Sequence, residues 1–239
     1  MKFLISKEIA EKYPDFTIGI VIAKNIHNRD SNEEIMQLLQ EQELNIRTEF
    51  QLENLAQSSL IQSWRKAYKL FGEKDDRASH EALIKRVLKG GSIQHINKLV
   101  DLYNYLSLKY KTPVGGEDLD KIEGNIYLKF ADGSESFVLL GSDAETHPDK
   151  GEVIYADEKE VLCRKWNWRE SEKTKLTEET VNAFLVIEAL TPLTKDAVDQ
   201  AARELAMLLN KYCKAETQIF ILDKNNLEIE FSFCRYAKP

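Results

Sequence analysis

Residues 92–130 read SIQHINKLVDLYNYLSLKYKTPVGGEDLDKIEGNIYLKF, and the spacing of the apolar residues changes within this stretch. Up to the glycine pair Gly115-Gly116, apolar residues recur every three or four positions, as they do on one face of a helix. After the pair, apolar and polar residues alternate, which is typical of a strand. The stretch therefore predicts a helix that starts near Gln94, then a glycine loop, and then strands.

Helices are predicted mainly before this stretch and strands mainly after it. A buried strand over 16–23 precedes three helical patterns: 32 to the mid-50s, 59–72 and 80–89. Ser31 with Glu34 forms a capping box for the first helix, and Ser79 is the predicted cap of the third. Strand-like alternation follows in five segments: 125–131, 135–140, 152–156, 161–164 and 181–190.

The end of the chain carries one more helix and two more strands. Thr194 is predicted to cap a helix, and 218–222 and 227–233 are predicted to pair as a hairpin. We expect an α+β fold in a single domain, 1–239, with N-terminal helices packed on a mixed, mostly antiparallel sheet. Residues 191–239 would form the C-terminal helix and hairpin of the same domain.

The composition is that of an ordinary water-soluble globular protein, with 43% hydrophobic and 31% charged residues. No apolar run approaches the roughly 18 residues that a membrane helix needs, and the N-terminal segment lacks the apolar core of a signal peptide. Cys163, Cys213 and Cys234 are widely spaced and odd in number, which favours free thiols over disulfides or a zinc site. We therefore expect a cytoplasmic protein with no membrane partner, no metal and no other cofactor.

The net charge of −7 argues against a protein that coats nucleic acid through positive charge alone, and no DNA partner is expected. Positive charge is nevertheless concentrated in two segments. Residues 59–90 contain eight Lys and Arg against four acids, and a second cluster comprises Arg164, Lys165, Arg169, Lys173 and Lys175. Such clusters can contact a few phosphates, although two solvated helix faces would have the same composition.

A polar row accompanies the apolar face of the predicted helix near Gln94. The residues expected to face the core are Ile96, Leu99, Val100, Tyr103 and Leu106. Asn97, Asp101 and Asn104 repeat at the same spacing on a neighbouring face. The glycine loop that follows could leave its N–H groups free for an oxyanion or a carbonyl. The row and the loop together predict the rim of a binding cavity; a solvated helix surface is the alternative.

A second candidate is the segment 163–175, in which Trp166 and Trp168 alternate with polar residues. On a strand the two rings would share one face, with Lys165, Asn167 and Arg169 on the other. Aromatic rings next to Arg suit base stacking or phosphate contact. The alternatives are that the tryptophans close the edge of the core or form a surface for another protein.

Nucleophilic and metal catalysis are not indicated. His27, His80, His95 and His147 are scattered, and none lies in a recognisable Ser, Cys or metal motif. Cys163 reads as a small buried strand residue, although Arg164 beside it could lower a thiol pKa. The sequence contains neither a P-loop nor a dinucleotide fingerprint.

Several of these motifs occur together, in order, in a known family. They are Asn97-Lys-Leu-Val-Asp-Leu-Tyr-Asn104, Pro113-Val-Gly-Gly-Glu-Asp-Leu-Asp-Lys-Ile-Glu-Gly124, Gly151-Glu-Val-Ile-Tyr-Ala-Asp157, Arg164-Lys-Trp-Asn-Trp-Arg169 and Thr174-Lys175. The chain resembles the B3/B4 editing domain of the phenylalanyl-tRNA synthetase β subunit, and specifically its free-standing relatives. The resemblance is strongest over 59–190 and implies the same α+β fold.

The resemblance implies a pocket for an amino-acid moiety at the aminoacylated 3′ end of a tRNA. It implies a trans-acting hydrolase of mischarged tRNA, or a non-catalytic module that binds tRNA or an amino acid; ligase activity is not expected. The implied catalytic residues are Asp101, Asn104, Gly115 and Gly116. The implied substrate-binding residues are Asn97, Glu117, Asp118, Trp166 and Asn167. The residues implied to hold tRNA phosphates are Arg164, Arg169 and Lys175.

The chain departs from the synthetase pattern at two places. The synthetase loop resembles Pro-Leu-His-Ala-Phe-Asp, whereas this chain has Pro113-Val-Gly-Gly-Glu-Asp118, so that Gly115 replaces the editing-site His. A later Gly-Gly-x-x-Gly-Gly-Glu segment becomes Lys165-Trp-Asn-Trp-Arg-Glu170. A different acyl group, another way of positioning water, or loss of catalysis would each be compatible with these changes.

Overall fold

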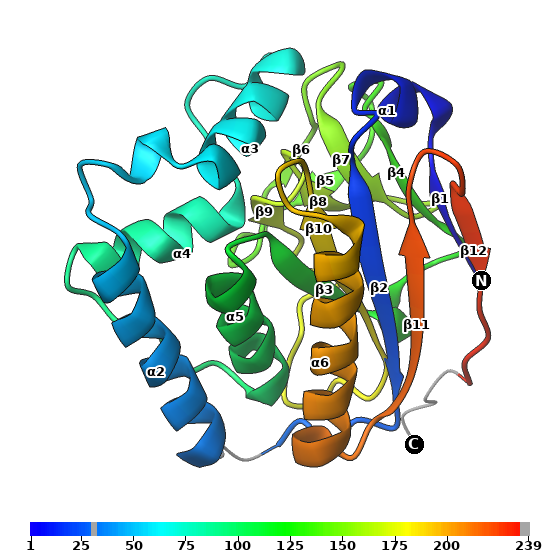
Figure 1. Cartoon of the computed structure of the whole chain (residues 1–239). Helices are drawn as coiled ribbons and strands as arrows, with labels where there is room; N and C mark the ends of the chain where they lie inside the picture. Colours follow the sequence, from blue (N-terminus) through cyan, green and yellow to red (C-terminus); the bar gives the residue numbers. More distant parts are fainter. Residues whose placement is uncertain (30–32, 235–239) are drawn as a thin grey trace.

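The computed structural model describes residues 1–29 and 33–234, and Figure 1 shows the arrangement of its elements. The helices are α1 (Lys7–Lys12), α2 (Glu33–Glu49), α3 (Ser59–Leu70), α4 (Ser79–Leu88), α5 (Lys98–Tyr110) and α6 (Lys195–Cys213). The strands are β1 (Lys2–Ile5), β2 (Thr17–Lys24), β3 (Val114–Asp118), β4 (Ile126–Phe130), β5 (Phe137–Val138), β6 (Glu145–Thr146), β7 (Val153–Ala156), β8 (Val161–Arg164), β9 (Arg169–Glu170), β10 (Ala183–Ala189), β11 (Glu216–Leu222) and β12 (Glu228–Glu230). Short 3₁₀ turns lie at Leu55–Gln57 and Leu119–Lys121.

The strands form two main sheets. One has the order β12-β1-β4-β7-β8-β9 and the other the order β11-β2-β10-β3, while β5 and β6 pair separately. Strand pairing is antiparallel except between β1 and β4. The predicted α+β class with a mixed, mostly antiparallel sheet is confirmed.

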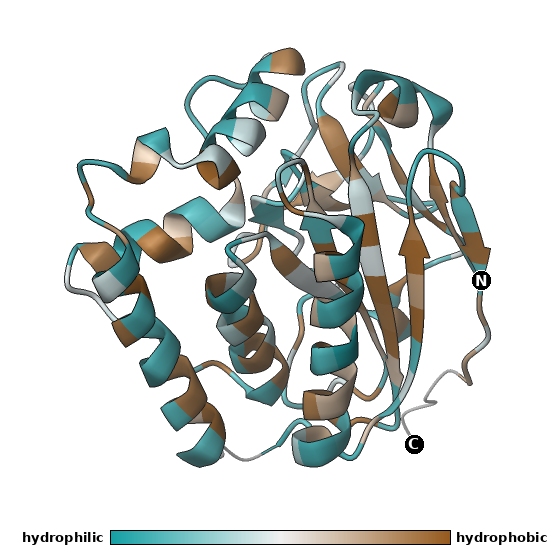
Figure 2. Cartoon of the chain, viewed as in Figure 1, coloured by the Kyte–Doolittle hydropathy of each residue, from teal (hydrophilic) through white to brown (hydrophobic). Residues whose placement is uncertain are grey.

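The four-stranded sheet lies between two hydrophobic layers. One face packs against helices that include α5 and α6, and the other faces the six-stranded sheet. Strands β2 and β10 are buried on both faces, because nearly every residue in them is apolar. Gly19 lets α6 approach β2 closely: a Cβ there would lie 2.9 Å from Val198 Cγ1. Figure 2 shows hydrophobic residues concentrated in these central strands.

All five predicted helices are present, several with shifted ends, and α1 was not predicted. Helix α5 begins at Lys98, not near Gln94, because the Asn97 side chain accepts a hydrogen bond from the N–H of Val100 and so caps the helix. Ile96 therefore lies before the helix and is exposed, contrary to its predicted place in the core. Ser79 is the first residue of α4, and Ala78 occupies the cap position. The predicted cap Ser31 lies outside the described residues.

Two predictions about the strands were wrong. Strands β11 and β12 do not pair as a hairpin, because β11 pairs with β2 and β12 with β1, in different sheets. The glycine loop is strand β3, which pairs with β10 as the edge of the four-stranded sheet. The cap at Thr194 is confirmed, since its Oγ1 accepts a hydrogen bond from the N–H of Ala197.

Candidate functional site

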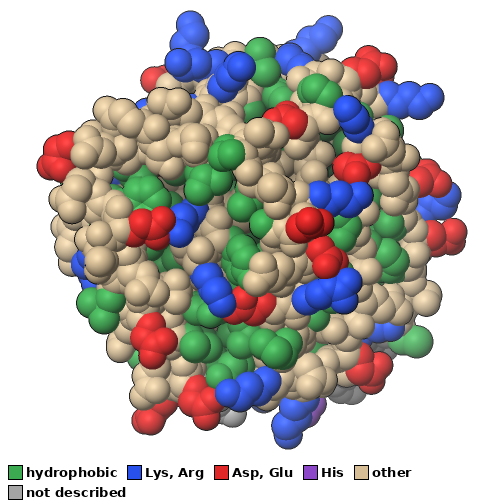
Figure 3. Space-filling view, in the orientation of Figure 1, with side chains coloured by type: hydrophobic (Ala, Val, Ile, Leu, Met, Phe, Trp, Pro, Cys, Tyr) green, Lys and Arg blue, Asp and Glu red, His purple; other side chains and the backbone are tan. Residues whose placement is uncertain are grey.

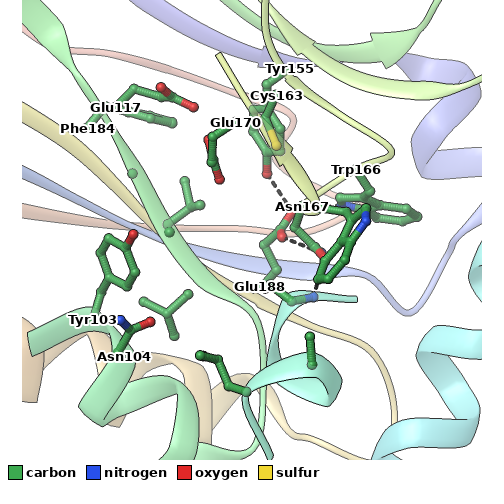
Figure 4. Close-up of a pocket in the computed structure, with 18 of the residues that line it drawn as sticks. Tyr103, Asn104, Glu117, Tyr155, Cys163, Trp166, Asn167, Glu170, Phe184 and Glu188 are labelled. Atoms are coloured by element: carbon green, nitrogen blue, oxygen red, sulfur yellow. Dashed lines mark hydrogen bonds between the residues drawn. The ribbon is translucent and has the colours of Figure 1, made fainter. Parts of the chain in front are cut away.

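A cavity of about 250 Å³ lies where the edge strands β3 and β9 of the two sheets come together (Figure 4). The four-stranded sheet contributes residues 114–117 and the side chains of Phe184, Val186 and Glu188. The six-stranded sheet and its last turn contribute Tyr155, Cys163, Trp166, Asn167, Trp168 and Glu170. Helices α4 and α5 complete the wall with Ser79, Ala82, Leu83, Arg86, Tyr103 and Asn104.

The register of β3 on β10 decides which glycine can serve a ligand. Glu188 N donates to Pro113 O at 3.0 Å and Leu119 N to Asn182 O at 2.9 Å, which sets the alternation of the ladder. By that alternation the N–H of Gly115 points toward β10, and the N–H of Gly116 points to the open edge. Only one of the two predicted glycine donors is therefore available to an oxyanion.

Glycine at position 115 leaves open space next to an acid. A Cβ placed on Gly115 would lie 3.7 Å from Glu170 Oε1, so that any side chain here would enter the cavity. A Cβ on Gly116 would instead overlap the Leu185 side chain and lie 2.8 Å from Phe184 O. Gly115 thus shapes the cavity, and Gly116 permits the close packing of β3 on β10.

Glu117 and Glu170 form a carboxyl pair in the cavity wall. Glu117 is 6% exposed, and the two side chains are hydrogen-bonded to each other. Burial and the neighbouring Glu170 charge raise the pKa of Glu117 well above its ordinary value, and burial raises the pKa of Glu170. Two carboxyls in contact repel each other when both are ionised, so the pair favours holding a proton.

A third acid, Glu188, holds the opposite wall together. Its carboxylate accepts hydrogen bonds from Tyr155 Oη at 2.6 Å, Trp166 Nε1 at 2.7 Å and Asn167 Nδ2 at 2.8 Å. Burial raises the pKa of Glu188 to about 7, against the lowering effect of these three donors. Because these three hydrogen bonds occupy the Glu188 carboxylate, Glu188 positions its neighbours and has little remaining capacity to bind a ligand.

Polar groups on the helix side have no partner in the protein. The Asn104 side chain is 8% exposed and lines the cavity, and neither its amide nor the Tyr103 hydroxyl makes a hydrogen bond within the described residues. Figure 4 shows both side chains on the α5 side of the cavity, across from Glu170 and Asn167. Trp168 Nε1 is also buried without a partner in the described part of the chain. Such groups are satisfied when a polar ligand enters.

The predicted polar row reaches the cavity only at its last member. Asn97 caps α5 and donates to Leu176 O at 3.2 Å, and Asp101 accepts from Ile96 N at 3.2 Å and pairs with His95. Both side chains are buried in these contacts and neither lines the cavity. The three residues do not form one ridge, because Asn97 precedes the helix and Asp101 turns back toward the residues before it.

Two further residues predicted to bind substrate, Trp166 and Asp118, are held mainly by contacts within the protein. Residues 165–168 form a turn in which Lys165 and Trp166 have positive φ, so Trp166 and Trp168 do not share the face of a strand. Trp166 is fully buried against the rings of Tyr13, Phe16 and Trp64, and both Trp166 and Trp168 line the cavity. Asp118 accepts hydrogen bonds from Asp120 N and Thr180 Oγ1 outside the cavity.

Asn167 links the turn to its surroundings. Its Oδ1 accepts hydrogen bonds from Tyr68 Oη at 2.9 Å and from Ser79 N at 3.2 Å, and its Nδ2 donates to Glu188. One side chain thus connects α3, the start of α4 and β10. Asn167 lines the cavity, yet all of its amide atoms are used by the protein.

The predicted phosphate-binding residues differ in their availability. Arg164 makes a bidentate ion pair with the buried Glu152, at 3.0 and 2.8 Å, and is itself 15% exposed. Arg169 is 43% exposed and pairs with Asp76 at 3.3 Å, and the exposed Lys175 pairs with Glu172. Arg169 and Lys175 therefore lie at the surface, where a phosphate can reach them, whereas Arg164 is occupied by its ion pair with Glu152.

A groove beside the cavity gathers further cations. It is lined by Arg77, Lys85, Arg86 and Lys89 together with Asp75 and Asp76, and it shares Ala82, Arg86 and Trp168 with the cavity. Among the described residues, Lys85, Arg86 and Lys89 form no ion pair. Figure 3 shows basic and acidic side chains interspersed on the face it presents, so positive charge there is local and not continuous. We call Lys85, Arg86 and Lys89 the basic groove.

Over residues 1–29 and 33–234, no helix has the length and apolar character of a membrane span, and no three His, Cys, Asp or Glu side chains converge as a metal site would require. The three cysteines are unpaired. Burial raises the pKa of the Cys163 thiol well above its ordinary value, in agreement with a buried strand residue and against a reactive thiolate.

These features define a class: an α+β protein that encloses an acidic cavity between the edges of two sheets. Residues 63–214 match the B3/4 domain, and the chain belongs to this family. It is similar to the phenylalanine–tRNA ligase beta subunit of Fusobacterium nucleatum, with 24% identity over 144 residues. The same subunit of Photorhabdus laumondii is 29% identical over 118 residues.

The matched segments cover 60% and 49% of this chain but only 17% and 14% of those two subunits. Among solved structures, an N-terminal fragment of the phenylalanyl-tRNA synthetase beta subunit from Pyrococcus horikoshii is similar, with a TM-score of 0.46 and 16% identity. That comparison covers 90% of this chain and 49% of the fragment.

Glu170, Glu188 and Tyr103 line the cavity, although no motif in the sequence indicated them as site residues. Glu188 carried a usable signal, because it is the one acid in the otherwise apolar strand segment Ala183–Ala189. Tyr103 was assigned to the core from helical spacing. Glu170 lies in a two-residue strand with no pattern of its own.

Proposed function

We propose that this protein binds the aminoacylated 3′ end of a tRNA and hydrolyses the ester of a mischarged amino acid. The single observation that carries the proposal is an acidic cavity that opens beside the basic groove. An aminoacyl-tRNA end has the complementary distribution of charge, with a protonated amino group on one side of the ester and phosphates on the other. Membership of the B3/4 family and the named ligase subunits among its relatives support tRNA as the carrier.

The acyl group would lie in the cavity, with its apolar part against Val114, Phe184 and Val186. The terminal phosphates would lie on Lys85, Arg86 and Lys89, with the exposed Arg169 and Lys175 as outer contacts. Trp168 lines both hollows and could stack on the terminal base.

The chemistry would use the acid pair to activate water. The Glu170 carboxylate would accept a proton from a water molecule while its oxygen attacks the ester carbonyl. The N–H of Gly116 and the free amide of Asn104 would stabilise the oxyanion. When the ester C–O bond breaks, a carboxyl of the pair returns a proton to the ribose oxygen, so the acids end as they began.

A non-catalytic binding module is the second candidate. Gly115 stands where the resemblance to the synthetase loop places a His, and binding through the same cavity and groove would need no base. This candidate predicts saturable binding of aminoacyl-tRNA without release of the amino acid.

The test is to incubate the protein with a panel of charged tRNAs and to measure release of the amino acid. We expect release above the spontaneous rate for at least one mischarged tRNA, and loss of that release in Glu170→Gln. Glu145→Gln, which removes an exposed acid on β6, is the matched control and should retain the rate. No release by the wild-type protein from any charged tRNA would reject hydrolysis, and saturable binding in the same samples would favour the binding module.

A further inference from the structure

The acid pair is the least compensated charge in the cavity. Glu117 and Glu170 contact each other, and their other near partners are the neutral Thr174 hydroxyl and Cys163 thiol. The cavity-lining residues include no cation except Arg86 on α4, which also lines the groove. Burying an anion without a cation is costly, so such sites are kept where a ligand supplies the missing charge. By contrast, Glu188 has three donors of its own and Arg164 neutralises Glu152.

We propose that Glu117 and Glu170 form an ammonium subsite, which holds a protonated primary amine of the ligand between the two carboxyl groups. The subsite rests on the proposed function only in taking the cavity as the ligand site, and it does not depend on ester hydrolysis.

The surroundings fit an amine carried on an apolar chain. The open space at Gly115 lies next to Glu170 Oε1 and gives the ammonium group a place to sit. Val114, Phe184 and Val186 provide an apolar wall. The unpartnered Asn104 amide and Tyr103 hydroxyl remain for the carbonyl and the other polar atoms of the ligand.

Amine binding should release a proton. The raised pKa values of the two carboxyls favour a proton on the empty pair, whereas an ammonium group beside both carboxylates favours their ionisation. The other titratable groups around the pair are Cys163 on β8, Tyr103 on α5, Tyr155 on β7, Glu188 on β10, Arg86 on α4 and Asp118, which follows Glu117 on β3. Burial raises the pKa values of the Cys163 thiol and of the Tyr103 and Tyr155 hydroxyls, so all three stay protonated and do not supply the released proton.

The protonated amine could be the α-amino group or a side-chain amine. Four amides of equal chain length separate these sources: lysinamide carries both amines, norleucinamide only the α-amine, ε-aminocaproamide only the terminal amine, and caproamide none. Their affinities are measured by titration calorimetry at neutral pH, in two buffers of different ionisation enthalpy, to count released protons.

The subsite predicts that at least one amine-bearing compound binds about tenfold or more tightly than caproamide. The preference should disappear in Glu117→Gln and Glu170→Gln, and the proton release should disappear in Glu117→Gln. Glu145→Gln should keep both, and circular dichroism of each variant checks folding. Whichever of the α-amine or terminal amine carries the preference identifies the amine.

Equal affinity for caproamide, no binding of any amine at millimolar concentration, or an unchanged preference in both variants would overturn the subsite. These results are separable from those of the deacylation assay. Amine binding without deacylation would refute only hydrolysis, and deacylation without amine preference would refute only the subsite.

Discussion

The Tyr155 hydroxyl donates a 2.6 Å hydrogen bond to the Glu188 carboxylate, and this contact joins the two sheets beside the cavity. Tyr155 lies on β7 and Glu188 on β10, and Trp166 and Asn167 bind the same carboxylate from the connecting turn. A single acid therefore holds three parts of the cavity wall, β7, β10 and the turn, in fixed relation.

Replacing Glu188 with Ala should destabilise the protein by about 3 kcal/mol or more, because three buried donors lose their acceptor. Tyr155→Phe removes one hydrogen bond from the same group and should cost about 1 kcal/mol. Urea unfolding measures both values. Similar stability losses in the two variants would contradict the central place given to Glu188.

The two neighbouring glycines of β3 should respond in opposite ways to alanine. Gly115→Ala places a methyl group in open space and should change stability by less than about 0.5 kcal/mol. Gly116→Ala forces a methyl group into Leu185 and the Phe184 carbonyl and should cost about 2 kcal/mol.

A bulkier residue at position 115 tests the cavity itself. Gly115→Leu should block ligand binding while the unfolding transition stays close to that of the wild type. Binding of charged tRNA and urea unfolding are measured on the same preparation. Unimpaired binding by a folded Gly115→Leu protein would place the ligand elsewhere.

The acid pair should make stability fall as the pH rises. The pKa of Glu117 is raised in the folded protein above the ordinary value of 4.5, so the folded state holds the proton after the unfolded chain has lost it. The free energy of unfolding therefore decreases with pH above about 4.5. In Glu117→Gln this contribution is absent, and the difference between the two proteins should shrink or reverse from acid to neutral pH. A difference that does not vary with pH would contradict the raised pKa.

Arg164 and the basic groove should separate folding from nucleic-acid binding. Arg164→Ala leaves Glu152 buried without its cation and should cost about 3 kcal/mol of stability.

Lys89→Ala should leave stability nearly unchanged, weaken tRNA binding and reduce the slope of log affinity against log salt by about 1. Arg203→Ala, which removes an exposed cation on α6, is the control for the salt slope. An unaltered slope in Lys89→Ala would exclude this lysine as a phosphate contact.

The two tryptophans of the turn should also differ. Trp166→Ala should cost about 4 kcal/mol, because a fully buried ring is removed from an aromatic cluster. Trp168→Ala should preserve the fold and lower tRNA affinity about tenfold, through loss of base stacking. Unfolding curves and tRNA titrations distinguish the two effects, and a tRNA affinity that survives in Trp168→Ala would refute the stacking role.

The sequence pattern predicted the helices and strands that depend on residues close together in the chain. The apolar run at 16–23 predicts the buried strand β2, the Thr194 side chain caps α6, and a helix precedes the glycine pair, although the pair itself lies in strand β3 and not in a loop. The polar row placed Asn104 correctly on α5, and the likeness to the B3/4 family was readable from ordered motifs.

Contacts between residues far apart in the sequence decided how the strands pair and which side chains meet in the cavity. Gly115-Gly116 has loop composition, yet β10 supplies a partner and the segment becomes an edge strand, which leaves one N–H group to the cavity. Strands β11 and β12 are neighbours in sequence but join different sheets. Glu117 and Glu170 are far apart in the chain, and only the approach of two sheet edges brings their carboxyls together. The spacing of apolar residues gives no information about such contacts, because it indicates on which face of a helix or strand a side chain lies and not which other element packs against that face.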